Sequence, residues 1–373
     1  MNTAVVSSIE THPENTRLTK KLNEIKGQMQ DNVFPSLGQV IAQQTGTLIR
    51  KITRRQKPLA FWFSMTAIFL VILLAGYGVA LLFKTQLSLE SIQYQLIFCS
   101  LCLIFIIALQ SFITMVFATS REYLLNAMTL VTDLEDLQQQ IITVFSIKKQ
   151  FIFALVFTIV VTGIQIIFAL SLQTDFSIAI TISFALINII SGSYFYFAFL
   201  GLPTVLRFSR YHYKLFTANP SKSEFIDRLS DLLSVGVYIV AIWSSLFTLF
   251  LFLFFGKITS SIIILVIAFG WAPTIAFFVI NQIVLAKIIT NTKWIILNSI
   301  QAQIESLQHQ EAIFSEDTLK HIDTLLSYHD RIAATKNSAL DVRAGLNFLN
   351  SLLLPVIALV LANLGDIIAL FFT

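Results

Sequence analysis

The chain has 373 residues, of which 56% are apolar and only 12% are charged. Soluble proteins carry about 25% charged residues, so this composition excludes a soluble globular enzyme, a disordered scaffold and a collagen-like fibre. The apolar residues form long continuous runs, which also exclude an outer-membrane barrel with its short alternating strands. We therefore expect an all-α, multi-pass integral membrane protein in contact with the lipid bilayer, in the plasma membrane.

Residues 1–59 are polar and basic, and the first apolar run begins at Ala60. A secretory signal would place an apolar core within about the first 30 residues, so we expect this segment to be retained. Within it, apolar residues at helical spacing indicate one amphipathic helix. These residues are Leu18, Leu22, Ile25 and Met29. We assign 1–59 as a cytoplasmic basic N-terminal segment.

A helix needs about 20 apolar residues to cross the hydrocarbon core of a bilayer. Seven runs of the sequence reach this length and predict seven transmembrane helices. The runs are 60–83, 94–118, 151–171, 177–201, 235–255, 260–286 and 346–372. We therefore expect transmembrane helices 1–6 with helical cytoplasmic loops over 60–286, and transmembrane helix 7 over 346–373.

The basic residues predict the orientation of these helices. If the N-terminus is cytoplasmic, the inside segments hold 23 of the 25 Lys and Arg residues. Those segments are 1–59, 119–150, 202–234 and 287–345. Only Lys84 and Lys257 would lie outside. Such a bias satisfies the positive-inside rule, so we expect the N-terminus inside and, with seven spans, the C-terminus outside.

Two cytoplasmic segments have helical patterns of their own. An apolar stripe runs from Leu125 to Phe145 without Gly or Pro, so we expect the second transmembrane helix to continue well below the membrane. Residues 287–345 predict a cytoplasmic helical hairpin, with a break near 310–314 and a second helix starting at Ser315, where acidic residues suit a helix N-terminus. Its apolar faces should pack against each other or against a neighbouring subunit. They carry Ile289, Trp294, Leu297, Ile300, Ile304 and Leu307 on the first helix, and Leu319, Ile322, Leu326 and Ile332 on the second.

The sequence contains no recognisable catalytic constellation. It lacks a glycine-rich phosphate loop, an H-E-x-x-H motif and a G-x-S-x-G motif. Cys99 and Cys102 lie within an apolar run, which favours a packing role over redox chemistry. His321 and His329 are eight residues apart and share a helix face only loosely, so we interpret them as surface residues. We expect no enzymatic activity, metal site or cofactor, and no nucleic-acid partner.

The last apolar run has small and polar residues at spacings of three and four. They are Asn347, Ser351, Pro355, Ala358, Ala362 and Asp366. Such a stripe commonly allows tight helix packing in lipid. The alternative is that it lines a pore at the centre of an oligomer, with a ring of Asp366 carboxylates that prefers cations.

A second group of polar and aromatic residues lies within spans three to six. The candidates for a ligand pocket among them are Gln165, Asn188, Tyr194, Trp243 and Trp271. Polar side chains in lipid need hydrogen-bond partners, so most should connect neighbouring helices. Some of them could instead line a pocket in the outer half of the bundle for a small, largely apolar ligand.

Seven spans, a cytoplasmic N-terminus, a long extension between spans six and seven and a length near 370 residues resemble the insect odorant and gustatory receptor superfamily. That resemblance implies a homo-tetrameric, ligand-gated cation channel whose last helix lines the pore and whose cytoplasmic helices form an anchor. The last helix of that family usually carries a Thr-Tyr pair followed by Gln-Phe, and 347–372 contains no such pair. The run 340–364 (LDVRAGLNFLNSLLLPVIALVLANL) also resembles the end of uncharacterised bacterial membrane proteins.

These observations lead to a main functional hypothesis and to competitors. The main hypothesis is an oligomeric, seven-helix, ligand-gated ion channel that conducts cations and responds to a small molecule. The competitors are a membrane transporter or lipid-handling protein, and a non-conducting sensor or scaffold that signals through the hairpin 287–345.

Overall fold

The computed structural model describes residues 13–337, with the exception of 32, 54–58, 83–88, 172–177, 256–270 and 309–315. The described residues fold into helices joined by short connections, and their one β-type contact is an isolated bridge between Met128 and Tyr213. The protein is therefore all-α over this part of the chain. The last predicted span, 346–372, lies outside the described residues.

Six helices are long and apolar enough to cross a membrane, and they correspond to the first six predicted runs. They are α3 (Phe61–Leu82), α4 (Leu89–Thr119), α7 (Ile147–Ser171), α8 (Ile178–Phe208), α9 (Glu224–Phe255) and α11 (Ala272–Gln308). α8 occupies the centre of the bundle, because it packs against α3, α4, α7 and α11. α9 packs against α4 and α11. The count of seven spans and the orientation across the membrane remain predictions.

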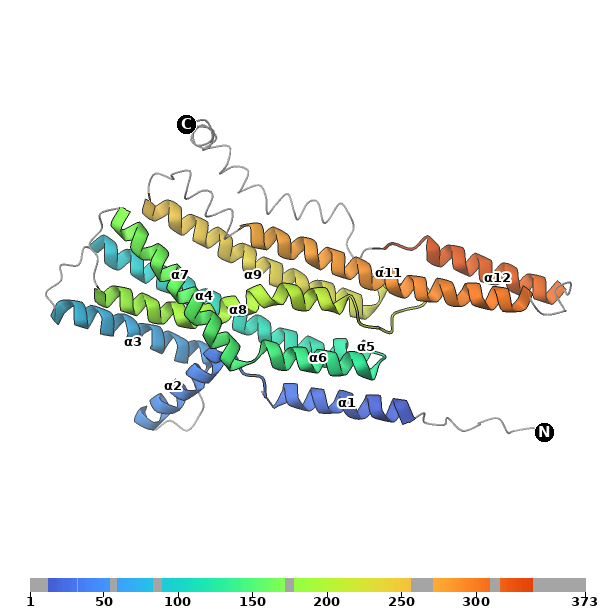
Figure 1. The fold of residues 1–373 in the computed structure, drawn as a ribbon, viewed down its shortest axis with the longest axis horizontal. Coiled ribbons are helices and arrows are strands. Elements are labelled where there is room, and N and C mark those ends of the chain that lie inside the picture. The colour runs from blue at the N-terminus through green and yellow to red at the C-terminus, as the bar shows by residue number, and fades with distance from the viewer. Residues whose placement is uncertain are drawn as a thin grey trace, which may run out of the picture.

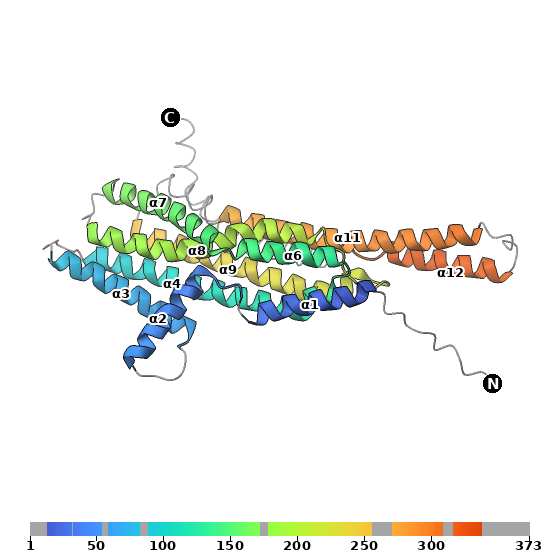
Figure 2. The same cartoon turned by 60° about the horizontal axis from the view of Figure 1, so that its bottom comes forward.

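The described part of the molecule is elongated, with the spanning helices along its long axis (Figures 1 and 2). The end of α3 and the start of α4 lie at one end of the bundle. The end of α7, the start of α8 and the end of α9 lie at the same end. The opposite end carries α1 (Pro13–Gln30), α6 (Val131–Val144) and the start of α9. Most of the basic residues of the described chain belong to segments at this second end.

The N-terminal segment packs onto the bundle. α1 lies along α6, and its predicted apolar face is confirmed because Ile25 and Met29 are buried against the bundle. α2 (Leu37–Thr53) starts at the bundle, contacts α3 and α8, and then projects away from the bundle axis (Figure 2).

The expected continuous extension of the second transmembrane helix is wrong beyond Ala127. α4 continues through a π-helical turn, Ser120–Leu124, and a short helix α5, Leu125–Ala127. At Met128 the backbone becomes extended, and α6 then returns toward the membrane helices. The neighbouring loop causes the break, because the Thr129 amide donates to the His212 carbonyl (3.1 Å) and the Lys214 amide donates to the Ala127 carbonyl (2.7 Å).

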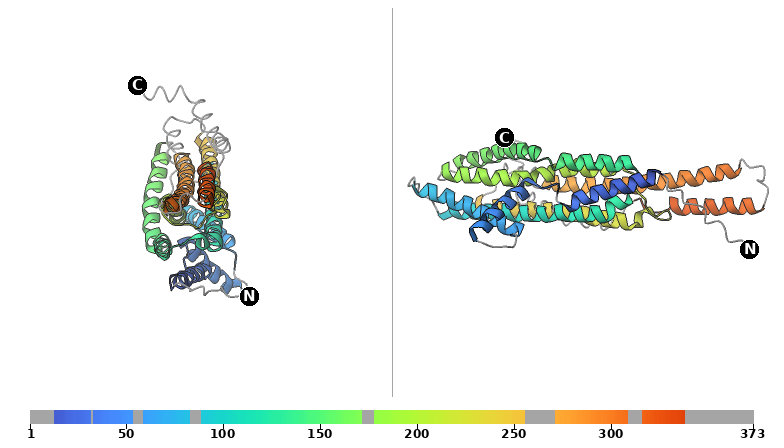
Figure 3. Two further views of the ribbon diagram at one scale, coloured as in Figure 1. Left: turned by 90° about the vertical axis from the view of Figure 1, so that its right-hand side faces the viewer. Right: turned by 90° about the horizontal axis from the view of Figure 1, so that it is seen from below.

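The helical hairpin expected near the C-terminal end is present in the described residues. α11 extends beyond the other helices, and α12 (Glu316–Ala333) folds back along it (Figure 3). Their contact buries Leu297, Ile300, Ile304 and Ile332, with Ile322 packed against them. Three residues of the predicted apolar faces are exposed instead, namely Trp294, Leu319 and Leu326.

Lys293 caps this hairpin from inside. Its ammonium is buried and donates to the carbonyls of Ala333 (2.7 Å) and Thr335 (2.8 Å) and to Asn337 Oδ1 (2.9 Å). The carbonyls at the end of a helix lack intrahelical partners and carry a partial negative charge, which a cation stabilises. This side chain of α11 therefore stabilises the C-terminal end of α12.

Two apolar clusters form the core of the bundle. The first surrounds α3, α4 and α8 and includes Cys99 and Cys102, which are buried and free, in agreement with a packing role. The second lies at the end that carries α1 and α6, and it joins those helices to α4, α8, α9 and α11. A cavity extends between these clusters.

Candidate functional site

A cavity of about 510 Å³ lies between α4, α6, α8, α9 and α11, with Met29 of α1 at its wall. Ligand pockets for small molecules commonly measure about 300–1,000 Å³ and are mainly apolar. Nine phenylalanines line this one. They are Phe105, Phe112, Phe117, Phe145, Phe195, Phe197, Phe199, Phe208 and Phe277. No charged side chain lies among the described residues that form the wall.

Aromatic contacts shape both ends of the cavity. At the end nearer the middle of the bundle, the Trp243 ring lies 4.5 Å from Phe105 and 5.9 Å from Phe195. At the other end, the Phe145 ring lies 5.0 Å from both Phe117 and Phe197. Aromatic pairs at these separations contribute about 0.5–1.5 kcal/mol beyond their burial. These contacts therefore stabilise the walls at both ends of the cavity.

Gly236 and Gly201 give the cavity part of its width. A Cβ at Gly236 would lie 2.9 Å from Cζ of Phe112 and 3.0 Å from Cε1 of Phe277, so glycine permits the close approach of these rings. A Cβ at Gly201 would meet only Phe277, at an ordinary 3.9 Å. A larger side chain at 201 would therefore extend into open space.

One buried amide at the wall has an unpaired oxygen. Gln140 of α6 is 6% exposed, and its Nε2 donates to Asp136 Oδ2 and to the Tyr211 hydroxyl, both at 2.7 Å. The Tyr211 hydroxyl in turn donates to Asp136 Oδ2 (2.7 Å). A carboxylate only accepts hydrogen bonds, so Asp136 requires the NH₂ group of Gln140 to face it. The opposite atom, Oε1, is buried without a partner among the described residues, at a cost of about 1–3 kcal/mol.

The face of α6 that carries Asp136 also binds the loop that follows α8. Asp133 Oδ2 accepts from the backbone amide of His212 (2.7 Å), one turn before Asp136 reaches Tyr211. Burial raises the pKa of the Tyr211 hydroxyl well above its ordinary value, and the hydrogen bond to Asp136 raises it further. Tyr211 therefore stays protonated and keeps the orientation of the Gln140 amide.

A second polar group lies on α4. Ser120 opens the π-helical turn Ser120–Leu124, and both of these residues line the cavity. The Ser120 side chain makes no hydrogen bond within the chain as far as the structure describes it. π-helical turns are rare and occur frequently at functional sites. This turn places a hydroxyl at a wall whose other polar side chains are Gln140, Thr204 and Ser244.

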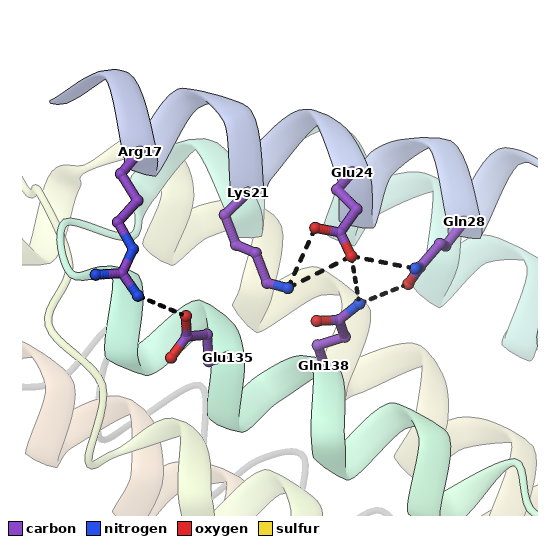
Figure 4. A network of polar contacts seen from close by, with 6 residues as sticks. All are labelled: Arg17, Lys21, Glu24, Gln28, Glu135 and Gln138. Atoms are coloured by element: carbon purple, nitrogen blue, oxygen red, sulfur yellow. Dashed lines mark hydrogen bonds and ion pairs between the residues drawn. The ribbon is translucent and has the colours of Figure 1, made fainter. Parts of the chain in front are cut away.

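α1 covers that end of the cavity and is attached to α6 by polar contacts (Figure 4). Gln138 of α6 donates to Glu24 Oε1 (3.2 Å) and to Gln28 Oε1 (2.8 Å). Lys21 donates to Glu24 as well, and the Gln138 and Lys21 bonds lower the pKa of the Glu24 carboxyl. Arg17 reaches Glu135 at 3.4 Å. These contacts keep Met29 at the cavity wall.

The structure separates the five predicted pocket residues. Trp243 lines the cavity. Asn188 donates to Gln165 Oε1 (3.2 Å) and joins α8 to α7, whereas Trp271 Nε1 donates to Thr248 (3.3 Å) and contacts α9. Tyr194 donates to Gln110 Oε1 (3.0 Å), beside Ser36 at the start of α2. Four of the five therefore connect helices to one another.

The six pore-lining candidates, from Asn347 to Asp366, lie outside the described residues. The described residues contain no group of three or more potential metal ligands. Sequence reasoning missed Gln140, which lies in the segment Leu125–Phe145 that was expected to extend the second transmembrane helix, and Ser120, which lies between that segment and the predicted span 94–118. The density of phenylalanines was the signal that could have indicated an aromatic cavity, since the chain contains 34 of them.

Comparison with protein-family models, with curated proteins and with solved structures gives no match to this chain.

Proposed function

We propose that this membrane protein binds a lipophilic small molecule in the phenylalanine-lined cavity, and that the ligand gates a cation-conducting oligomer. The cavity is the observation that supports the ligand. It is large enough for a small molecule, its wall is almost entirely apolar, and five helices and α1 meet around it. Binding there would remove apolar ligand surface from water, which stabilises the complex by about 25 cal/mol per Å².

Gating follows if the open and closed arrangements differ in this cavity. A ligand shifts an equilibrium only by its difference in affinity for the two states. α9 and α11 pack against each other and both contribute to the wall, and α11 continues into the hairpin with α12. A ligand that separates them would move the hairpin. Its exposed Trp294, Leu319 and Leu326 are the residues that we assign to contacts between subunits.

The binding step can be tested with tryptophan quenching. A variant that retains Trp243 alone, with Trp62, Trp271 and Trp294 replaced by Phe, is reconstituted in nanodiscs and titrated with bromododecane. We expect saturable quenching, because Trp243 lines the cavity. A variant that retains Trp62 alone is the control for partition into lipid, since Trp62 is 56% exposed, and its quenching should rise without saturation.

A matched pair of glycine variants tests where the probe binds. Gly201→Leu should weaken saturable quenching, because the new side chain extends into the cavity. Gly78→Leu is the control, since a Cβ at Gly78 meets nothing within 4 Å. Equal quenching of both variants, or quenching of Trp243 that never saturates, would overturn the binding proposal.

The gating step is tested in planar bilayers. Unitary cation currents that depend on the probe, and that Gly201→Leu reduces, support the channel. Saturable binding without currents would instead favour the second candidate, a lipid-handling protein. The position of Phe199 favours that candidate specifically, because this side chain lines the apolar cavity and is also 51% exposed on the outer face of α8. A scrambling assay with fluorescent lipids in liposomes measures this activity.

A further inference from the structure

The last two turns of α2 carry an apolar and basic surface beside the start of the first spanning helix. We infer that this α2 surface, formed by Leu48, Arg50, Lys51 and Ile52, binds anionic lipid in the membrane leaflet at the end of the bundle that carries α1 and α6. The helix lies among the lipid head groups, with its apolar side toward the hydrocarbon. The surface is outside the phenylalanine-lined cavity, so the inference is independent of the proposed function.

One apolar stripe runs along α2, and the protein covers only its first part. Ile41 packs against the core of the bundle. Leu48 follows Ile41 by seven residues and Ile52 follows by eleven, so the three lie on one side of the helix. Leu48 is 59% exposed and Ile52 is 72% exposed. The stripe therefore continues past the part that the bundle covers, as in a helix that lies at a membrane surface.

The contact between α2 and α3 indicates the depth of this surface. Ser64 lies in the first turn of the spanning helix α3, and a Cβ at Gly46 would lie 3.1 Å from its Oγ. The middle of α2 therefore crosses α3 where the span begins. Trp62 is exposed in the same turn, and tryptophan is enriched at the boundary between hydrocarbon and water. From this level the rest of α2 projects away from the bundle axis (Figure 2).

The charges around the α2 surface are all positive. Arg50 and Lys51 lie in the same two turns as its apolar side chains. α2 and the helices that it packs against, α3, α7 and α8, contain no Asp or Glu. Lys148 and Lys149 are exposed at the start of α7, next to Gln150, whose Oε1 accepts from the first amide of α2 (2.7 Å). Basic residues next to an amphipathic helix attract anionic lipid head groups.

The same charges favour lipid over a second copy of the chain. A symmetric contact through the α2 surface would bring Arg50 and Lys51 of one copy near the same residues of the other, and like charges repel. A lipid supplies both complements at once, because its phosphate pairs with the basic side chains and its acyl chains cover Leu48 and Ile52.

The test places a single tryptophan on the α2 surface. Leu48→Trp is made in a chain whose four native tryptophans are replaced by Phe. Gln43→Trp is the matched control, because Gln43 is exposed and lies about 140° around the helix from Leu48. Both proteins are reconstituted in nanodiscs of phosphatidylcholine and phosphatidylglycerol, one of which carries brominated acyl chains. We expect brominated lipid to quench the tryptophan introduced at position 48, and aqueous iodide to quench the one introduced at position 43.

The charge requirement is tested by exchanging which lipid is brominated. We expect half-maximal quenching at position 48 at a lower mole fraction of phosphatidylglycerol than of phosphatidylcholine. Arg50→Gln with Lys51→Gln should reduce this preference by about fivefold for each basic side chain removed. Lys320→Gln with Arg331→Gln removes the same charge from exposed positions of α12 and should leave the preference unchanged.

Three results would overturn the inference. One is equal quenching by the two lipids. Another is protection of the tryptophan at position 48 from both lipid and iodide, which would assign the surface to a contact with protein. The unmodified chain provides the third measurement if the variants fail to fold. Amide hydrogen exchange of 47–53 should be slower in nanodiscs with phosphatidylglycerol than in phosphatidylcholine alone, whereas exchange of 316–333 should not change. Equal exchange of 47–53 in both lipids would contradict the inference.

Discussion

Substitution of Gly38 by alanine tests whether the N-terminal segment is an integral part of the membrane bundle. Gly38 lies in the first turn of α2, directly against the ring of Tyr194 in α8. An added Cβ would lie 2.7 Å from the ring carbon Cζ, whereas carbon atoms in good contact are about 3.5–4.0 Å apart. Tyr194 is completely buried and donates to Gln110 Oε1 (3.0 Å), so its ring has little freedom to move.

The expected cost has two parts. Overpacking of a well-packed core costs about 1–3 kcal/mol. A shift of the ring would also weaken the hydrogen bond to Gln110, which is worth about 1 kcal/mol net. We therefore expect Gly38→Ala to lower the free energy of unfolding by about 2–4 kcal/mol.

The measurement is thermal or denaturant unfolding in detergent, with Gly27→Ala as the control. Gly27 also lies within a helix of the N-terminal segment, but a Cβ there meets nothing within 4 Å. This control should be neutral or stabilising by about 0.5–1 kcal/mol, because alanine loses less backbone entropy than glycine on folding. Combining Gly38→Ala with Tyr194→Leu should remove most of the cost, since the shorter side chain leaves room for the methyl group.

Two results would refute this reasoning. One is a Gly38→Ala protein as stable as the Gly27→Ala control. The other is a cost that stays the same in the Tyr194→Leu background, because it would place the effect of the added methyl away from the ring of Tyr194.

Three further predictions concern the capping lysine and two titrating groups. Lys293→Met should destabilise α12 by about 2 kcal/mol, since three acceptors lose a charged donor, and the amide hydrogen exchange of 316–333 should become faster. Lys320→Met, which removes an exposed ion pair, is the control and should change this exchange little. Equal effects of the two substitutions would contradict the capping role of Lys293. The raised pKa of Tyr211 contributes stability that is complete below the ordinary tyrosine pKa of about 10 and lost as pH rises beyond it. In a plot of the unfolding midpoint against pH, Tyr211→Phe should therefore reduce the decline at alkaline pH. An unchanged decline would count against this role of Tyr211. The lowered pKa of Glu24 contributes stability that is present above its ordinary value of 4.5 and lost as pH falls below it. Spin-label distances between α1 and α6 should then increase in acid. In Glu24→Gln the distance should be the same at every pH, and an acid-dependent increase that persists in this variant would contradict a role for the carboxylate.

The spanning helices followed from local sequence properties. The predicted run 60–83 corresponds to α3, Phe61–Leu82, because continuous hydrophobicity over one membrane thickness needs no tertiary information. Ile25 and Met29 were likewise placed on a buried helix face from their spacing alone. α12 begins at Glu316, next to the predicted start, because acidic residues suit a helix N-terminus.

The break after Ala127 was not accessible in this way. The segment Leu125–Phe145 contains no Gly or Pro, and its own pattern is helical throughout. The chain turns at Met128 because the loop around His212, more than 80 residues away, supplies backbone partners for it. Local propensity is a weak constraint that tertiary contacts override.

The sequence by itself determined that the described part of the chain is helical, and where its six helices that are apolar enough to cross a membrane lie along the chain. Hydrophobicity, spacing and terminal charges act within a few residues along the chain, so they can be read without a structure. Only the tertiary structure decided which polar residues face one another. Asn188, Tyr194 and Trp243 are all polar or aromatic residues of apolar spans, yet one joins two helices, one anchors α2 and one lines the cavity. Their roles differ because each depends on the partner that another helix brings to it.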